Sequence, residues 1–232
     1  MITVIGSLNM DLVVQMNAFP KQGETILGHA FQTVPGGKGA NQAVATARLG
    51  SDVAMIGCVG QDSFGERLCV GLQQEQVNTD AIVHSTTAPT GIANILIFNQ
   101  DNRIVVVPGA NYELAPSHIE ASKDLIQKSQ MVIIQLEIPK ETTAYAGSDG
   151  ARYFDGTFPI HIPGYMTTAV DTTGAGDTFN GALAHALVEG QSLDEAVYFA
   201  NLAASLSVEK FSAQGGMPTL GEVYACMAGT GK

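Results

Sequence analysis

The sequence predicts an α/β layer fold with a mostly parallel sheet, and three observations support this. Short apolar runs typical of buried strands alternate with segments of 3.6-residue periodicity. The 232 residues are 45% hydrophobic and only 14% charged, which is enough apolar material for a large core. Two of the apolar runs are joined by too few residues to hold a crossover helix. We therefore expect one domain, residues 1–232, with a small antiparallel part.

Strands are expected where the short apolar runs are rich in β-branched residues. These runs cover residues 3–5, 53–58, 92–98, 104–107, 131–136 and 151–154. The runs 92–98 and 104–107 are separated by a polar stretch that begins at Asn99, so they should form a hairpin that stands apart from the parallel sheet.

Helices are expected between several of the strands and near the end of the chain. The periodic segments cover residues 40–49, 64–74, 116–128 and 176–189. Gly190 is a plausible C′ residue for the last of these. Ser192 and Glu195 have the spacing of a capping box and predict the start of one more helix, which carries a stripe of small side chains.

Charge and cysteine content limit the functional classes. The formal charge of −11 argues against nucleic acid or an anionic membrane as a partner, because both are bound by surplus Lys and Arg. Any phosphate should therefore be held by backbone N–H groups and a metal. Cys58, Cys69 and Cys226 are too few and too scattered for a disulfide framework or a zinc site. The first residues resemble neither a signal peptide nor a membrane anchor, so we expect a cytoplasmic protein.

Two glycine-rich loops, 35–41 and 172–177, lead directly into predicted helices. Neither fits a Walker P-loop or the Rossmann fingerprint, because the P-loop lysine pattern and the third Rossmann glycine are both absent. Free N–H groups at a helix start bind anions, and glycines let the backbone approach them closely. An ordinary turn before a helix is the alternative for either loop alone. Both loops together, each with an acid nearby, favour an anion site.

Asp177 follows Gly-Ala-Gly in the first turn of a predicted helix. The helix dipole favours an acid there on structural grounds alone and should lower its pKa. The preceding residues, however, offer no capping side chain and leave the amides open. Phosphoryl transfer has a loose transition state, so a weak base in the right place suffices for the attacking hydroxyl.

Four motifs together resemble the ribokinase family, also called the PfkB family, of ATP-dependent sugar and nucleoside kinases. They are GSLNMD (6–11), PGGKGANQA (35–43), VGQDSFG (59–65) and DTTGAGDTFNGAL (171–183). The resemblance covers nearly the whole chain. It implies a three-layer α/β/α fold with a small β lid from strands around 12–15, 27–33 and 92–107, which often pairs with a second lid in a homodimer. It also implies ATP, Mg²⁺ and a monovalent cation such as K⁺ as cofactors, and a sugar primary hydroxyl, that of D-ribose first of all, as the acceptor.

The resemblance assigns expected roles to individual residues. The sugar hydroxyls would be held by Asn9, Asp11, Gly37, Lys38, Asn41 and Glu137. An anion hole for the transferring group would consist of Gly174, Ala175 and Gly176, with Asp177 as the base. The nucleotide would contact Gly147, Ser148, Asp149, Gly150, Gly176 and Asn201. The monovalent cation would be bound by Asp171, Thr173, Ser207, Lys210, Ser212 and Gly216, with Lys210 using only its carbonyl. A polar turn after a strand is the alternative for Asn9 and Asp11.

The chain departs from the family pattern between Ala146 and Gly147. At about 30 residues for each βαβ unit, roughly two units are absent there. They would include the Asn-x-x-Glu motif of the family, which helps to organise magnesium and phosphate and has no substitute in this sequence. Missing central strands would also leave unpaired sheet edges. Either the natural chain has a segment at this point, or it is a shortened form with an incomplete nucleotide pocket.

Two other functions remain open. One is a kinase for another sugar, a nucleoside or a keto-deoxy acid. The other is a catalytically silent protein that binds a sugar or regulates a partner, which the absent segment makes plausible. A nucleoside pocket should offer more aromatic stacking surface near the lid. Sugar binding without ATP turnover would distinguish the silent protein from the kinase.

Overall fold

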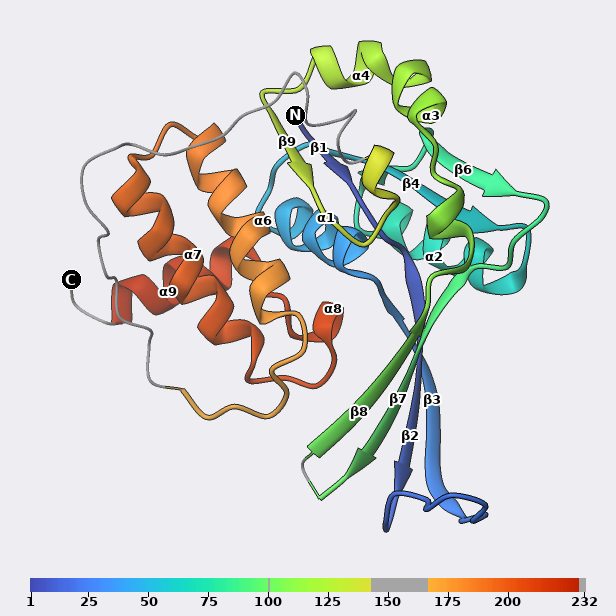
Figure 1. Ribbon diagram of the computed structural model, residues 1–232. Coiled ribbons are helices and arrows are strands. Elements are labelled where there is room, and N and C mark those ends of the chain that lie inside the picture. Colours follow the sequence, from blue (N-terminus) through green and yellow to red (C-terminus); the bar gives the residue numbers. More distant parts are fainter. Residues whose placement is uncertain (100, 143–166, 230–232) are drawn as a thin grey trace.

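The computed structural model describes residues 1–99, 101–142 and 167–229 (Figure 1). A parallel sheet has β1 (Ile2–Ile5) at its centre, between β4 (Val53–Gly60) and β9 (Met131–Ile134). Two short strands, β5 (Val77–Asn78) and β6 (Ile82–Ser85), pair with the two ends of β4. Every residue of β1 and β4 is buried, which explains their continuous apolar sequences.

Helices cover both faces of this sheet. On one face, Val4 and Met55 pack against α1 (Lys38–Arg48) and α2 (Ser63–Gln74). On the other face, Ile5 and Ile56 pack against η1 (Gly109–Glu113) and α3 (Pro116–Ala121). The alternation follows from the two-residue period of a strand. The predicted three-layer α/β/α arrangement is confirmed.

The second sheet projects away from the layered body (Figure 1). It consists of β2 (Asn9–Met16), β3 (Gly28–Gly36), β7 (Gly91–Phe98) and β8 (Asp101–Val107), in the order β3-β2-β7-β8. We call it the lid sheet. The predicted hairpin is confirmed, since β7 and β8 pair antiparallel from Ile92 opposite Val107 to Phe98 opposite Asp101. The hairpin begins earlier in β8 than predicted, because polar residues at its tip continue the pairing.

A third group of helices packs next to α1 (Figure 1). It includes α6 (Ala175–Val188), α7 (Leu193–Ser207) and α9 (Leu220–Gly229), which share an apolar cluster with Leu49. The predicted caps are confirmed: Ser192 and Glu195 form a capping box, and Gly190 has a φ of 83°. A β-carbon at Gly181 would come 2.9 Å from the Ala45 β-carbon, so this glycine allows α6 to lie close to α1.

Some elements differ from prediction. The segment 116–128 is two helices, α3 and α4 (Lys123–Gln127), because the chain breaks at Ser122, whose hydroxyl donates to the His118 carbonyl. β5, β6, η1 and α8 (Ala213–Gly216) were not predicted, since elements this short carry no periodicity. The longer α9 was also not predicted. The predicted strand 151–154 lies outside the described residues.

The parallel sheet ends at β9 in the part of the chain that the structure describes. All four residues of β9 are half-buried, unlike those of β1. Leu136, just after the strand, is 73% exposed. An edge of the sheet at β9 in the described part of the chain is consistent with the absent segment predicted from the sequence. None of the helices in the described ranges is long and apolar enough to cross a membrane.

Candidate active site

The starts of α1 and α6 meet at a buried carboxylate. Asp177 is 8% exposed, and its two oxygens accept hydrogen bonds from Asn41 Nδ2 and Gln42 Nε2, each at 3.1 Å. Burial raises the pKa of Asp177, and the two amides and the Lys38 charge only partly oppose this. The expected lowering of this pKa at a helix start is therefore wrong, because desolvation outweighs the stabilisation of the charged form. A raised pKa makes Asp177 a better proton acceptor once ionised.

The two glycine loops lead into α1 and α6, and no side chain caps the start of either helix. Gly37 precedes α1 with a φ of 89°, and Gly174 precedes α6 with a φ of 81° in the left-handed region. A β-carbon at Gly37 would come 2.5 Å from the Asn9 backbone nitrogen, so no other residue fits there. No side chain caps α6, whose first residues are Ala175 and Gly176. This helix start offers backbone N–H groups and a positive dipole end to an anion.

Charged side chains gather beside Asp177 at the ends of β1 and β9. Lys38 Nζ lies 2.6 Å from Glu137 Oε1, and the Ser7 hydroxyl donates to Glu137 Oε2 at 3.2 Å. Burial, together with the nearby Glu137 charge, raises the pKa of Asp11 to about 7. The hydrogen bond to Glu137 raises the pKa of Lys38. Acceptors and a cationic donor thus lie together, as the binding of several hydroxyl groups requires.

Asn9 is fixed by a residue that the sequence did not single out. Asn9 is 4% exposed, and its Oδ1 accepts a hydrogen bond of 2.8 Å from Asn111 Nδ2. Asn111 is also buried, and its side chain bonds the backbone N–H and carbonyl of Leu8. A single buried amide thereby fixes the start of β2. No sequence signal marks Asn111, because Leu8 and Asn9, which it fixes, are more than 100 residues away.

The residues expected at a cation site come together from two segments. Asp171 accepts hydrogen bonds from the backbone N–H groups of Thr173 and Ser212 at 2.9 and 3.0 Å. A β-carbon at Gly216 would collide with the Ser207 carbonyl oxygen, and the Lys210 carbonyl oxygen lies 3.6 Å from the same position. The Lys210 ammonium instead pairs with Glu222 at 2.9 Å on the surface.

This set of oxygens fits a hard monovalent cation better than a transition metal. The residues offer one carboxylate, backbone carbonyls and hydroxyl groups. The described residues contain no group of three or more His, Cys, Asp or Glu that could hold a metal ion.

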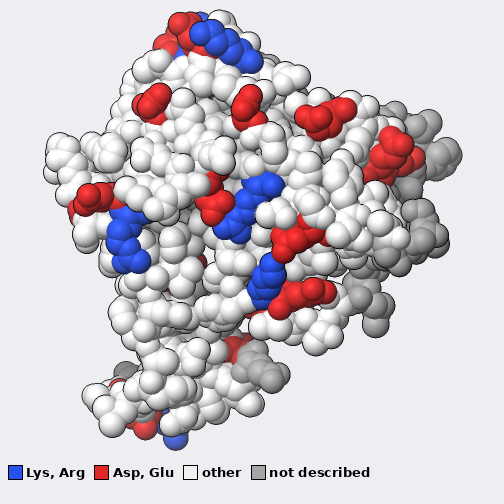
Figure 2. Space-filling model, turned by 180° about the vertical axis from the view of Figure 1, so that it is seen from behind, with Lys and Arg blue, Asp and Glu red and all other residues white. Residues whose placement is uncertain are grey.

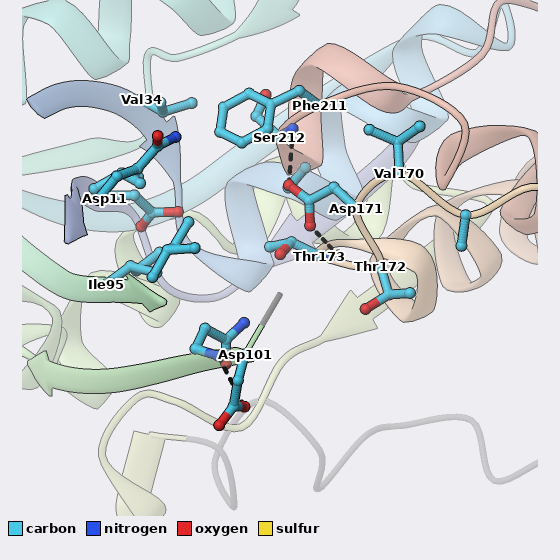
Figure 3. A pocket seen from close by; sticks show the side chains of 16 residues that line it. Asp11, Val34, Ile95, Asp101, Val170, Asp171, Thr172, Thr173, Phe211 and Ser212 are labelled. Atoms are coloured by element: carbon cyan, nitrogen blue, oxygen red, sulfur yellow. Dashed lines mark hydrogen bonds between the residues drawn. The ribbon is translucent and has the colours of Figure 1, made fainter. Parts of the chain in front are cut away.

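A cavity of about 630 Å³ lies between the lid sheet and this loop (Figure 3). Asp11, Val34 and Ile95 form the lid wall, and Val170 to Thr173, Phe211 and Ser212 form the opposite wall. Only Asp11 belongs both to this cavity and to the charged cluster around Glu137. Asp11 therefore links the cavity to the charged cluster. Phe211 is the one aromatic residue among those that line it.

The expected nucleotide contacts are not brought together in the described part. Gly147, Ser148, Asp149 and Gly150 lie outside the described residues. Asn201 lies in the middle of α7 and does not line the cavity. Gly176 is at the start of α6, as expected for an anion hole. Figure 2 shows acidic and basic side chains interspersed over one face of the molecule, with no continuous basic surface.

The fold and this site together define a carbohydrate kinase of one family. The model of the "pfkB family carbohydrate kinase" matches residues 1–146 and 137–220, and the chain belongs to this family. The predicted resemblance is confirmed. A ribokinase of Bacillus subtilis is 41% identical over 285 aligned positions, which cover 96% of this chain and 97% of the relative.

Solved structures agree with this assignment. A ribokinase from Thermotoga maritima has a TM-score of 0.88 and 28% identity, over 98% of this chain and 99% of that chain. A ribokinase from Arabidopsis thaliana, complexed with ribose and ATP, has a TM-score of 0.82 and 27% identity, over 97% of both chains.

The comparisons also support the predicted internal omission. The Bacillus subtilis alignment runs over 285 positions, although this chain has only 232 residues, so a stretch of the relative has no counterpart here. The family model matches in two pieces that overlap at residues 137–146. The overlap places the break within or next to residues 137–146, close to the position predicted from the sequence.

Proposed function

We propose that this protein transfers the γ-phosphoryl group of ATP to the primary hydroxyl of D-ribose. The observation that carries the proposal is the buried Asp177 carboxylate at the uncapped start of α6, next to the cluster of Lys38 and Glu137. The names of the relatives, and the ribose and ATP in the Arabidopsis structure, support this substrate pair.

In this proposal each part of the site has one task. The sugar hydroxyls are held by Asn9, Asp11, Gly37, Lys38, Asn41 and Glu137. Asp177 accepts the proton of the primary hydroxyl, the sugar oxygen bonds to the γ-phosphorus, and ADP leaves with the electrons of the broken P–O bond. The N–H groups of Gly174, Ala175 and Gly176 stabilise the negative charge of the transferring group. The nucleotide is held by residues that include Gly147, Ser148, Asp149, Gly150 and Asn201.

A monovalent cation such as potassium would be held by Asp171, Thr173, Ser207, Lys210, Ser212 and Gly216. When bound, it supplies positive charge next to the start of α6. Magnesium is proposed only as the ion that accompanies ATP, because the Asn-x-x-Glu motif of the family is absent from this chain.

We also propose a homodimer formed through the lid sheet. The edge strand β8 exposes Ile104, Val105, Val106 and Val107 to 47, 60, 48 and 48%. A long apolar edge strand is prone to pair with another chain unless it is covered. In the proposed dimer, the lid sheet of a second copy of this chain covers the β8 edge.

Two alternatives remain in this proposal. A nucleoside as acceptor is disfavoured by the cavity lining, in which Phe211 is the only aromatic side chain among the residues that the structure describes. A silent sugar-binding protein is favoured by one observation, the omission after Ala146, which removes the magnesium motif.

The experiment is ribose-dependent release of ADP with magnesium and potassium present, in the parent and in Asp177→Asn. Loss of a general base lowers turnover about 10²- to 10⁴-fold, while ribose affinity measured by calorimetry should change little. Asp52→Asn, at an exposed position before β4, is the matched control. Parallel losses of affinity and turnover would make Asp177 a structural residue. A folded parent that binds ribose without releasing ADP would establish the silent protein instead.

A further inference from the structure

Gln42, a buried residue of α1, is in direct contact with the carboxylate of Asp177. The Gln42 side chain is 4% exposed, and its Nε2 donates to Asp177 Oδ1 at 3.1 Å. Its neighbour Asn41 donates to the other oxygen, Oδ2, at 3.1 Å. Consecutive helix residues point in different directions. Asn41 and Gln42 nevertheless reach the same carboxylate, and the close packing of α6 on α1 at Gly181 brings Asp177 near both.

The second polar atom of Gln42 has no partner. Among the described residues, Gln42 Oε1 is the only buried side-chain nitrogen or oxygen atom without a hydrogen bond. The charge of Asp177 explains why the Gln42 amide turns its nitrogen toward the carboxylate, since only an N–H group makes an attractive contact with a carboxylate. A buried unpaired oxygen lowers stability, and an apolar side chain of the same length would avoid that loss. The amide of Gln42 therefore lowers the stability of the fold and is explained by its contact with Asp177.

We propose that Gln42 is a positioning residue that fixes the plane of the Asp177 carboxylate for proton transfer from the sugar. The proposal rests on the function proposed above. An ionised carboxylate has about four lone-pair sites, of which Asn41 and Gln42 occupy two. The others stay open toward the sugar hydroxyl. The proton moves from that hydroxyl to one of them, and the two amides keep the carboxylate from turning away.

The contact also favours the charged form of the base. Both amides donate to Asp177 and thereby lower its pKa, against the larger effect of burial. The charged groups that act on Asp177 are Lys38 from α1, which lowers the pKa, and Glu137 after β9, which raises it. Removal of the Gln42 donor leaves these two charges in place. The pKa of Asp177 should therefore rise further.

The first experiment compares the parent with Gln42→Met, Gln42→Leu and the control Thr46→Val. Thr46 is buried one turn later on α1 and donates to the Gln42 backbone carbonyl, so Thr46→Val also removes one buried hydrogen bond, but one that does not involve Asp177. We expect kcat to fall about 10- to 100-fold in the Gln42 variants, with the ribose KM within about threefold of the parent value. The melting temperature of Gln42→Met should be unchanged or higher. An unchanged kcat would overturn the proposal. So would a lower kcat together with a higher KM and a lower melting temperature in both Gln42 variants.

The second experiment does not depend on turnover. The Asp177 carboxyl carbon is titrated by NMR in the parent and in Gln42→Met, and the pKa of Asp177 should be higher in the variant. An equal pKa in the two proteins rules out the proposed contact. If the parent releases no ADP but the pKa rises in Gln42→Met, the kinase function fails and the positioning of Asp177 by Gln42 stands.

Discussion

Asp171 and Ser212 lie 41 residues apart in the sequence, and the backbone N–H of Ser212 donates to Asp171 Oδ2 at 3.0 Å. The other carboxylate oxygen accepts from the N–H of Thr173 at 2.9 Å. One side chain therefore joins the loop before α6 to the loop before α8. These loops, together with the last residues of α7 and α8, contain the residues proposed to bind a cation.

Asp171→Asn should abolish stabilisation of the protein by potassium. The substitution removes the negative charge and turns one acceptor into an NH₂ group that faces a backbone N–H. A ligand at 100 times its Kd stabilises the folded state by about 2.7 kcal/mol, so the parent should melt at a higher temperature in potassium chloride than in equimolar tetramethylammonium chloride. Lys210→Gln should keep this difference, because the ammonium faces Glu222. Equal melting temperatures of the parent in the two salts would contradict the cation site.

Gly37→Ala should destabilise the protein and weaken ribose binding. Its φ of 89° strains any side chain by about 1–3 kcal/mol, and the new β-carbon would also press on the Asn9 nitrogen at 2.5 Å. Gly71→Ala is the matched control, since Gly71 lies inside α2 with no atom within 4 Å of a β-carbon. It should stabilise the protein by about 0.5–1 kcal/mol. Urea unfolding measures both effects. A change of the free energy of unfolding in the same direction in the two variants would refute this interpretation.

Asp11 should make the stability of the protein depend on pH. Its pKa is about 7 in the folded state against 3.8 for an unperturbed aspartate, so the folded state binds more protons between these values. Stability should therefore fall as pH rises from about 4 to about 7. Asp11→Asn should flatten this part of the profile and raise stability at pH 8, while ribose affinity falls. Asp52→Asn, at an exposed site, should leave the slope unchanged. Urea titrations at several pH values decide this, and an unaltered slope in Asp11→Asn would be incompatible with the raised pKa.

Ile104→Lys/Val105→Lys should convert the proposed dimer into a monomer. Adjacent strand residues point to opposite faces, so this double variant places a charge on each face of the edge strand β8. Sedimentation equilibrium measures the mass. Val70→Lys, at a 44% exposed position on α2, is the control and should leave the mass unchanged. A parent protein that sediments as a monomer at all concentrations would contradict the proposed dimer.

Local patterns were enough to predict much of the fold. The runs around β1 and β4 are apolar because these parallel strands are buried on both faces, and β9 continues the pattern at the edge of the same sheet. The β7/β8 hairpin followed from a loop too short for a helix, and the capping box of α7 from two residues three apart. β5 and β6 escaped prediction because strands of two and four residues carry too little pattern.

The sequence by itself determined the family, the two glycine loops and the position of Asp177, because these depend on residues that are neighbours in the chain. Only the tertiary structure decided how Asp177 is held, since Asn41 and Gln42 lie 136 and 135 residues away from it. It also reversed the expected direction of the Asp177 pKa. A helix dipole can be inferred from position in a helix, whereas desolvation depends on every segment that packs over the carboxylate.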